Sequence, residues 1–205
     1  MIRATILDYG AGNLHSLSKA LATPDVSVHI TTDPLSAIDT EALILPGVGA
    51  FTGAAGCLAP ARTALRRALI DGLPCLAICL GMQLLFDASE EGPGAGLGFF
   101  AGRVRRLNAA LVPHMGWNTL EESTDPLVAA GALETAYYAH SFACPPADPG
   151  VTTAWTLLDG DRFPAIIRRQ RTVGVQFHPE KSSAPGVRFI HRFLADVAGS
   201  QVAGS

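Results

Sequence analysis

The chain has 205 residues, 48% of them hydrophobic and 16% charged, so it can bury one sizeable core but is too short for two ordinary domains. Its formal net charge of −3 and sequence pI near 6.0 give no basic footprint for nucleic acid or for an anionic membrane. We therefore expect a single domain over residues 1–198, a frayed tail over residues 199–205, and a small molecule or another protein as partner.

The placement of apolar residues and cysteines disfavours further classes of protein. The first apolar run ends at Asp8, too early for a signal peptide, and a proline and a glycine interrupt the most apolar later stretch, so we expect a cytoplasmic protein without a membrane span. The four cysteines, at positions 57, 75, 79 and 144, lack the spacing of a zinc site. We expect no metal, no cofactor and no disulfide, with Cys57, Cys75 and Cys144 as small buried residues.

Short apolar runs alternate with amphipathic stretches in the first half of the chain. The runs predict strands over residues 4–7, 26–30, 42–45 and 75–78. Leucines at helical spacing after Asn13, a suitable N-cap, predict a first helix, and another is predicted over residues 61–70. This alternation is typical of a parallel sheet covered by crossover helices.

After a glycine-rich connection over residues 92–98, the pattern changes to strand-like runs separated by turns. The runs cover residues 99–107, 135–139, 152–157, 165–169 and 172–177, with a turn at 159–161 and a last helix over residues 185–197. The predicted fold class is therefore α/β, with a central, mostly parallel sheet flanked by helices and additional antiparallel strands in the second half.

The strand over residues 75–78 leads into a tight turn with a thiol at the corner. Ala77 and Gly81, two positions on either side of Cys79, are small enough for a sharp strand-to-helix corner, which is where α/β enzymes place a nucleophile. A cysteine attacks as the thiolate, which a helix N-terminus and a neighbouring imidazole both favour. The same corner should point the amide N–H of Leu80 towards the attacked carbonyl.

An imidazole and a carboxylate lie two positions apart in the segment from Gly174 to Glu180. In extended chain His178 and Glu180 project to the same side, so Glu180 can hold the imidazole that takes the proton of Cys79. Gly47 and Val48, at the end of the strand over residues 42–45, can offer a second amide to the oxyanion. These residues predict acyl transfer to sulfur followed by hydrolysis of the thioester.

Each of these residues also has a structural interpretation. A cysteine in an apolar strand is usually a packing residue, and a single histidine is more often structural than catalytic. For Cys79 and His178 the thiol corner, the glycine loop and the His-Pro-Glu element occur together, which favours catalysis. Trp117, Tyr137 and Tyr138 suit a core and an interface equally well.

With these residues laid out, the chain resembles the class I (triad) glutamine amidotransferases, and among them the glutaminase subunits of imidazole glycerol phosphate synthase. The general part of the resemblance is the Cys79 element with Gln83 and the element that joins His178 to Glu180. The specific part consists of the segments 8–14, 45–51, 113–118, 137–142 and 174–182. Two departures, Ala77 where glycine is usual and Phe142 where tyrosine is common, remove no catalytic group.

The resemblance implies a class I glutamine amidotransferase-like fold and hydrolysis of L-glutamine to glutamate and ammonia through a thioester on Cys79. It implies that the ammonia passes to a (β/α)8-barrel cyclase subunit, in a heterodimer that makes imidazole glycerol phosphate and aminoimidazole carboxamide ribotide in histidine biosynthesis. It assigns the glutamine to Gly49, Gln83 and the backbone around His140, Ser141 and Phe142. It assigns the barrel-facing surface to Asn13, Trp117, Tyr137 or Tyr138, and Lys181.

Three alternatives stay open at this point. The chain can be the glutaminase subunit of another synthase, such as that of pyridoxal phosphate or anthranilate, although the segments 8–13 and 113–118 favour the histidine pathway. It can be a thiol hydrolase or peptidase that acts alone. It can also be a non-catalytic scaffold domain, which the presence of Cys79, His178 and Glu180 argues against.

Overall fold

A seven-stranded sheet forms the centre of the molecule in the computed structural model, which describes residues 1–10, 14–128 and 132–202. Its strand order is β10-β11-β12-β4-β3-β1-β2. The pairs from β12 to β2 are parallel, and the pairs β10–β11 and β11–β12 are antiparallel. These strands are β1 (Ile2–Leu7), β2 (Val26–Thr31), β3 (Ala42–Leu45), β4 (Cys75–Ile78), β10 (Thr152–Leu158), β11 (Asp161–Arg169) and β12 (Thr172–Val175). The predicted α/β class with added antiparallel strands is confirmed.

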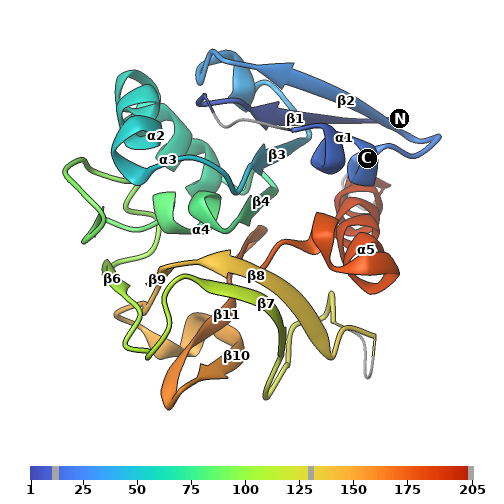
Figure 1. Cartoon of the computed structure of the whole chain (residues 1–205). Coiled ribbons are helices and arrows are strands. Elements are labelled where there is room, and N and C mark those ends of the chain that lie inside the picture. The colour runs from blue at the N-terminus through green and yellow to red at the C-terminus, as the bar shows by residue number, and fades with distance from the viewer. Residues whose placement is uncertain (11–13, 129–131, 203–205) are drawn as a thin grey trace.

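Helices cover both faces of the sheet. In Figure 1, α2 and α3 lie on one side of the parallel strands, and α1 and α5 lie on the other. The helices are α1 (His15–Leu21), α2 (Phe51–Leu58), α3 (Arg62–Ile70), α4 (Leu80–Leu84) and α5 (Ser183–Val202), with short 3-10 turns at Ser36–Ile38, Ala59–Ala61, Pro149–Val151 and Pro179–Lys181. Along the part of the chain that the structure describes, no helix has both the length and the apolar character needed to cross a bilayer.

The remaining strands form two small sheets beside the main one. One contains β5 (Ala88–Ser89), β6 (Arg103–Arg106) and β9 (Phe142–Ala143), and the other is the antiparallel ribbon of β7 (His114–Thr119) and β8 (Thr135–His140). Figure 1 shows this ribbon running past the ends of the central strands, next to α4. Its inward side chains, such as His114 and Tyr138, are buried, whereas Met115 and Trp117 on β7 are exposed.

Several boundaries differ from the predictions. The predicted strand over residues 99–107 is reduced to Arg103–Arg106, because Gly98 and Gly102 have positive φ angles that turn the chain on both sides of Phe99 and Phe100. The last helix continues to Val202, so residues 199–202 of the predicted tail are helical, and residues 203–205 lie outside the described residues. The first helix begins at His15 with Leu14 in the cap position, and Asn13 lies outside the described residues.

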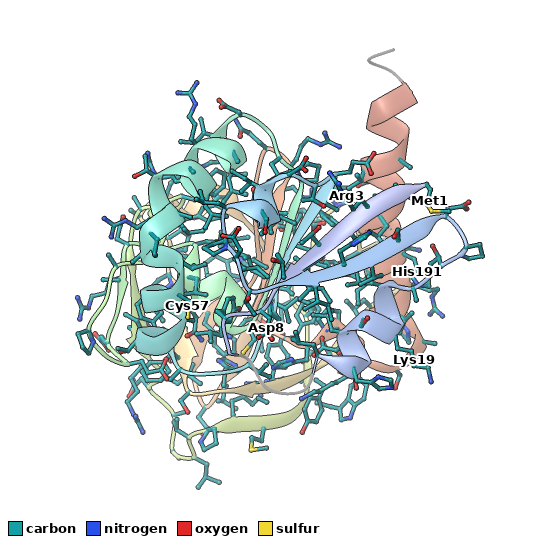
Figure 2. All side chains as sticks on the ribbon, turned by 90° about the horizontal axis from the view of Figure 1, so that it is seen from above. Met1, Arg3, Asp8, Lys19, Cys57 and His191 are labelled. Atoms are coloured by element: carbon teal, nitrogen blue, oxygen red, sulfur yellow. The ribbon has the colours of Figure 1, made fainter. Side chains whose placement is uncertain are left out.

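The prediction that Cys57 is buried is wrong. The helix α2, which the sequence did not predict, buries Phe51, Ala54, Ala55 and Leu58, and Cys57 falls on its outer side. Figure 2 shows Cys57 on this peripheral helix, away from the central strands. Cys75, Cys79 and Cys144 are buried.

Gly81 sets how closely α4 approaches the end of β3. A Cβ at this position would collide with the backbone oxygen of Leu45 and lie 2.8 Å from its carbonyl carbon, and backbone cannot move aside cheaply. The corner that presents Cys79 therefore depends on a glycine two residues after it.

We expect Gly81→Ala to lower the free energy of unfolding by about 1–3 kcal/mol, the usual cost of overpacking. Gly53→Ala is the matched control: Gly53 lies within α2, and its added Cβ would meet no atom within 4 Å. This control should stabilise the protein by up to about 1 kcal/mol, because alanine is the better helix former. Urea unfolding monitored by circular dichroism measures both changes, and equal effects at the two positions would contradict the packing argument.

Candidate active site

Cys79 occupies a strained corner between β4 and α4. Its φ of 48° lies in the left-handed region, which non-glycine residues rarely adopt. The conformation is held because the backbone N–H of Cys79 donates to the carbonyl of Val175 at 2.7 Å, at the end of the neighbouring strand β12. The nucleophile and the segment that follows β12 are thereby fixed to each other.

His178 follows β12, and both its backbone N–H and its backbone carbonyl are hydrogen bonded. Its N–H donates to the carbonyl of Tyr137 at 2.8 Å, and its carbonyl accepts from the Ser182 hydroxyl at 2.7 Å. The same hydroxyl accepts the N–H of Tyr137 at 2.9 Å, which closes a ring of hydrogen bonds with β8. Sequence reasoning missed Ser182, because a serine beside a helix start gives no indication of this long-range role.

The predicted contact between His178 and Glu180 is present, with Nδ1 and Oε1 2.8 Å apart. The predicted local structure is wrong, because Pro179–Lys181 form a 3-10 turn in place of extended chain. Proline suits the first position of such a turn, since its missing N–H needs no partner there. The turn bends the carboxylate of Glu180 back onto the imidazole.

The charges around His178 favour its protonated form. Burial lowers the pKa of His178, but the negative charge of Cys79, a hydrogen bond with its side chain, and the carboxylate of Glu180 together raise the pKa to about 10. Since Nδ1 faces Glu180, the other ring nitrogen, Nε2, faces the sulfur. The imidazole is therefore placed to hold a proton next to the sulfur.

The loop after β3 packs directly against this pair. A Cβ on Gly47 would lie 2.9 Å from Cε1 of His178 and 3.0 Å from Cβ of Cys79, so only glycine fits. Gly49 has a φ of +113°, which also favours glycine. The hydroxyl of Tyr9 donates to the carbonyl of Pro46 and anchors the start of the loop.

A cavity of about 350 Å³ opens at Cys79. It brings together all five residues predicted to hold the ligand and adds others that the sequence analysis had not selected; its walls are Gly47, Gly49, Cys79, Leu80, Gln83, Glu91, Pro113, Met115, Ala139, His140, Ser141 and Phe142. Glu91 is the most informative addition, because it brings the cavity a carboxylate, one oxygen of which accepts the N–H of Phe51 at 3.1 Å. A larger cavity of about 490 Å³ lies beside Pro74 and α5 and contains no cysteine or histidine.

Val48 does not line the cavity at Cys79. It faces a smaller space of about 130 Å³ on the other side of the loop, together with Glu180 and Lys181. The second carboxylate oxygen of Glu180 is buried and has no hydrogen-bond partner among the described residues. The loop therefore separates two spaces, and the assignment of oxyanion amides to Leu80, Gly47 and Val48 stays a prediction.

A chain of hydrogen bonds fixes His140 at the wall of the cavity. Nδ1 of His140 lies 2.7 Å from the carbonyl of Phe142, which can only accept, so this nitrogen carries the hydrogen. The bare Nε2 then accepts from Nδ1 of His114 at 3.1 Å, and Nε2 of His114 accepts from the Asn118 amide at 3.3 Å. Both imidazoles are thus neutral and have a defined tautomer.

The residues predicted to face a partner separate into surface and core. Trp117 is 53% exposed, Tyr137 is half-buried beside it, and Lys181 is exposed. Tyr138 is fully buried, because β8 alternates its side chains between two faces, and its hydroxyl lies 2.5 Å from that of Thr156. Tyr138 is therefore a core residue, which corrects the prediction that it can face a partner; Asn13 lies outside the described residues.

Comparison with known proteins gives consistent similarities over almost the whole chain. Residues 5–197 match the family model "Glutamine amidotransferase class-I". The chain is 42% identical over 199 residues to the imidazole glycerol phosphate synthase subunit HisH of Halobacterium salinarum, with 92% of this chain and 91% of that protein covered. The HisH subunit of Geobacillus thermodenitrificans is 41% identical, with coverage of 96% and 97%.

Solved structures show the same fold at lower identity. A crystal structure of a glutamine amidotransferase superposes with a TM-score of 0.72 at 19% identity, covering 96% of this chain and 98% of the other. A chain of the PurLQS structure from Thermotoga maritima gives a TM-score of 0.66 at 20% identity, with coverage of 96% and 99%. These similarities concern the fold alone.

The buried His140 predicts a loss of stability in acid. Burial, followed by the charges of His114 and His178, lowers the pKa of His140 to about 3 against the opposing bond to Phe142. Between about pH 6.5 and 3 the unfolded chain binds a proton there that the folded chain does not, so stability falls as pH falls. From pH 7 to 5 this contribution amounts to about 2 kcal/mol.

Urea unfolding at pH 7 and at pH 5 gives the free energy of unfolding at each pH. We expect the difference between these two free energies to be about 2 kcal/mol smaller in His140→Phe than in the wild type. Nuclear magnetic resonance of the wild-type imidazole is the control and should show a neutral ring at pH 5. A His140 ring that titrates near its ordinary value would contradict the prediction.

Proposed function

Because the chain belongs to the class-I glutamine amidotransferase family, we propose that Cys79, His178 and Glu180 hydrolyse the side-chain amide of L-glutamine. The observation that carries this proposal is a thiol at a strained corner beside an imidazole that a carboxylate orients at 2.8 Å, at the wall of a cavity of about 350 Å³. The ammonia produced serves a cyclase subunit that makes imidazole glycerol phosphate in histidine biosynthesis; the similarity to proteins named imidazole glycerol phosphate synthase subunit HisH supports this. The chain is thus the glutaminase subunit of a two-part synthase.

The acylation step uses the charge distribution around His178. The proton of the thiol passes to His178, the sulfur attacks the amide carbon, and the carbonyl oxygen becomes an oxyanion. The amide of Leu80, at the first residue of α4, has no partner within its helix, and an amide of the segment Gly47–Val48 completes the oxyanion site. Collapse breaks the carbon–nitrogen bond, and His178 gives its proton to the departing ammonia.

Deacylation reverses the roles. His178 takes a proton from water, the water oxygen bonds to the thioester carbon, and the carbon–sulfur bond breaks with its electron pair returning to sulfur. Glutamate leaves, and the net reaction converts glutamine and water into glutamate and ammonia. Glu180 holds the imidazole in the tautomer that both steps need.

The walls of the cavity match the two ends of an amino acid. Glu91 and the Gln83 side chain offer oxygens to the α-ammonium group of glutamine, and Glu91 is the one acidic side chain among the residues that line the cavity. Among the residues that the structure describes, no lysine or arginine lines the cavity, so the α-carboxylate is received by backbone amides around His140, Ser141 and Phe142 and by Gly49. The hydrogen-bond chain through His114 keeps this wall in place.

The outward face of the β7–β8 ribbon is the surface for the partner. Met115 is 65% exposed and Trp117 53% exposed, which is unusual for large apolar side chains on one strand. Met115 also lines the cavity, so a subunit that covers this face shields the reaction from water. The partner is a (β/α)8-barrel cyclase in a heterodimer, and its binding selects the active conformation of the loop from Pro46 to Gly49, where two glycines permit a peptide flip. We place the complex in the cytoplasm.

The reaction is tested with Cys79→Ala in the complex with the cyclase subunit of the same organism. Glutamate release should fall by at least about a thousandfold, because the nucleophile is lost, while complex formation is preserved. Cys75→Ala is the matched control: Cys75 is also buried in β4 but contributes only packing, so its activity should persist. Coupled assays for glutamate and ammonia check both variants, and full glutamate release by Cys79→Ala would refute the proposal.

The partner surface is tested with Trp117→Ala. We expect the dissociation constant for the cyclase to rise by about thirtyfold, the effect of losing a central aromatic anchor. Ile70→Ala is the control, because Ile70 is 40% exposed but ends α3 at the opposite edge of the sheet from Cys79. Titration calorimetry measures both constants. A similar loss in both variants, or no loss in either, would place the partner elsewhere.

A further inference from the structure

Gln176 is a buried side chain in direct contact with the sulfur of Cys79. It follows β12, is completely inaccessible to solvent, and donates its backbone N–H to the carbonyl of Ala165 at 3.0 Å. Its Nε2 lies 3.6 Å from Sγ of Cys79. The sulfur also has His178 beside it, and it lies 3.8 Å from the carbonyl of Ala139, which can only accept.

Cys144 determines which way the amide of Gln176 points. Its Sγ lies 3.5 Å from Oε1 of Gln176 in a fully buried position. Burial raises the pKa of the Cys144 thiol, and the negative charge of Cys79 raises it further, so Cys144 keeps its hydrogen and can donate it to Oε1, the oxygen that a negative sulfur at Cys79 would repel. A thiol that donates to Oε1 leaves Nε2, with its two hydrogens, on the side of Cys79.

We propose that Gln176 is a further catalytic residue, whose side-chain amide donates a hydrogen bond to the sulfur of Cys79 while Cys144 holds that amide in the donating orientation. The inference rests on the proposed glutaminase function for its biological meaning, but the hydrogen bond itself can be tested without glutamine.

The side-chain amide of Gln176 supplies a hydrogen bond to the sulfur that does not depend on a proton in transfer, which His178 cannot do. Negative charge resides on the sulfur before the attack and again when the carbon–sulfur bond of the thioester breaks and its electron pair returns to sulfur. His178 exchanges its proton during these steps, whereas an amide donor does not titrate and acts in both. A donor fixed in a buried site stabilises the thiolate without reorganisation.

The test is the pH dependence of alkylation of Cys79 by iodoacetamide in the full-length chain, because only the thiolate reacts. Peptide mass spectrometry separates the label on Cys79 from that on the exposed Cys57. The titratable groups that face the sulfur are His178, Tyr9 and Cys144, and each stays unchanged in Gln176→Met. We expect the pH midpoint of alkylation to rise by about one unit in this variant, equal to a tenfold loss of thiolate below the midpoint.

Two further variants keep the test decisive. Gln176→Glu preserves the size of the side chain but replaces the amide with a carboxyl group, which only accepts when ionised and adds negative charge beside the sulfur, so it should raise the midpoint at least as far, even if the methionine variant does not fold. Thr156→Val is the control, since it removes a buried hydroxyl that bonds Tyr138 and does not touch Cys79. Its midpoint should stay at the wild-type value despite a comparable loss of stability.

Cys144→Ala tests the orienting contact and should raise the midpoint by a smaller amount. Unchanged midpoints in both Gln176 variants would overturn the inference, and so would an equal shift in Thr156→Val. Glutamate release by the wild-type complex is measured in parallel. If that complex releases no glutamate while the midpoints shift, the proposed function fails and the hydrogen bond stands; if it releases glutamate while the midpoints do not move, only the role of Gln176 fails.

Discussion

The parallel pairing of β4 with β12 is the constraint on which the site depends. The two strands run in register, with Ile78 opposite Val175, so both end at the same edge of the sheet. The next residues of each strand are therefore neighbours in space although they are distant in sequence. Cys79 follows one strand and donates its N–H to the carbonyl of Val175 on the other. His178 lies three residues after Val175. The thiol and the imidazole meet because of this register.

The β7–β8 ribbon connects the site to the surface that we assign to a partner. The backbone of Tyr137 accepts from His178 and donates to Ser182, and the side chain of Tyr137 lies beside Trp117 on the outer face. The inner face of the same ribbon carries the His114 and His140 pair that supports the wall of the cavity. A displacement of this ribbon consequently moves His178 and the cavity wall at His140 together, because all of these contacts belong to two paired strands.

Local sequence determines the parts of this structure that were predicted, and long-range contacts determine the parts that were not. The strand before Cys79, the glycine at position 81 and the turn at Asp159 follow from short patterns, and the structure has all three. The strand order could not be deduced, because fully buried parallel strands lack the alternation that assigns side chains to faces.

The same distinction applies to individual residues of the site. Glu91 reaches the cavity because its loop is tied to Phe51 by a hydrogen bond between segments that are far apart in sequence. Gln176 is hidden in an apolar segment, and nothing in its neighbours indicates that Cys144 and Cys79 lie on either side of its amide. Tyr138 could be separated from Tyr137 only once the register of β8 against β7 placed it beside His114.

The loop from Pro46 to Gly49 also separates the cavity at Cys79 from a second space, which Glu180 lines. One carboxylate oxygen lies 2.8 Å from Nδ1 of His178, and the other is buried without a hydrogen-bond partner among the described residues; Glu180 and the exposed Lys181 both line the small cavity beyond the loop. The cavity of about 350 Å³ that we assign to the substrate lies on the opposite side, where Gly47 and Gly49 line it. A hydrogen-bond donor that reaches the second oxygen draws charge from the carboxylate and weakens its hold on the imidazole. The hold on the imidazole of His178 therefore depends on the space beyond the loop, whereas the cavity at Cys79 lies on the other side of it.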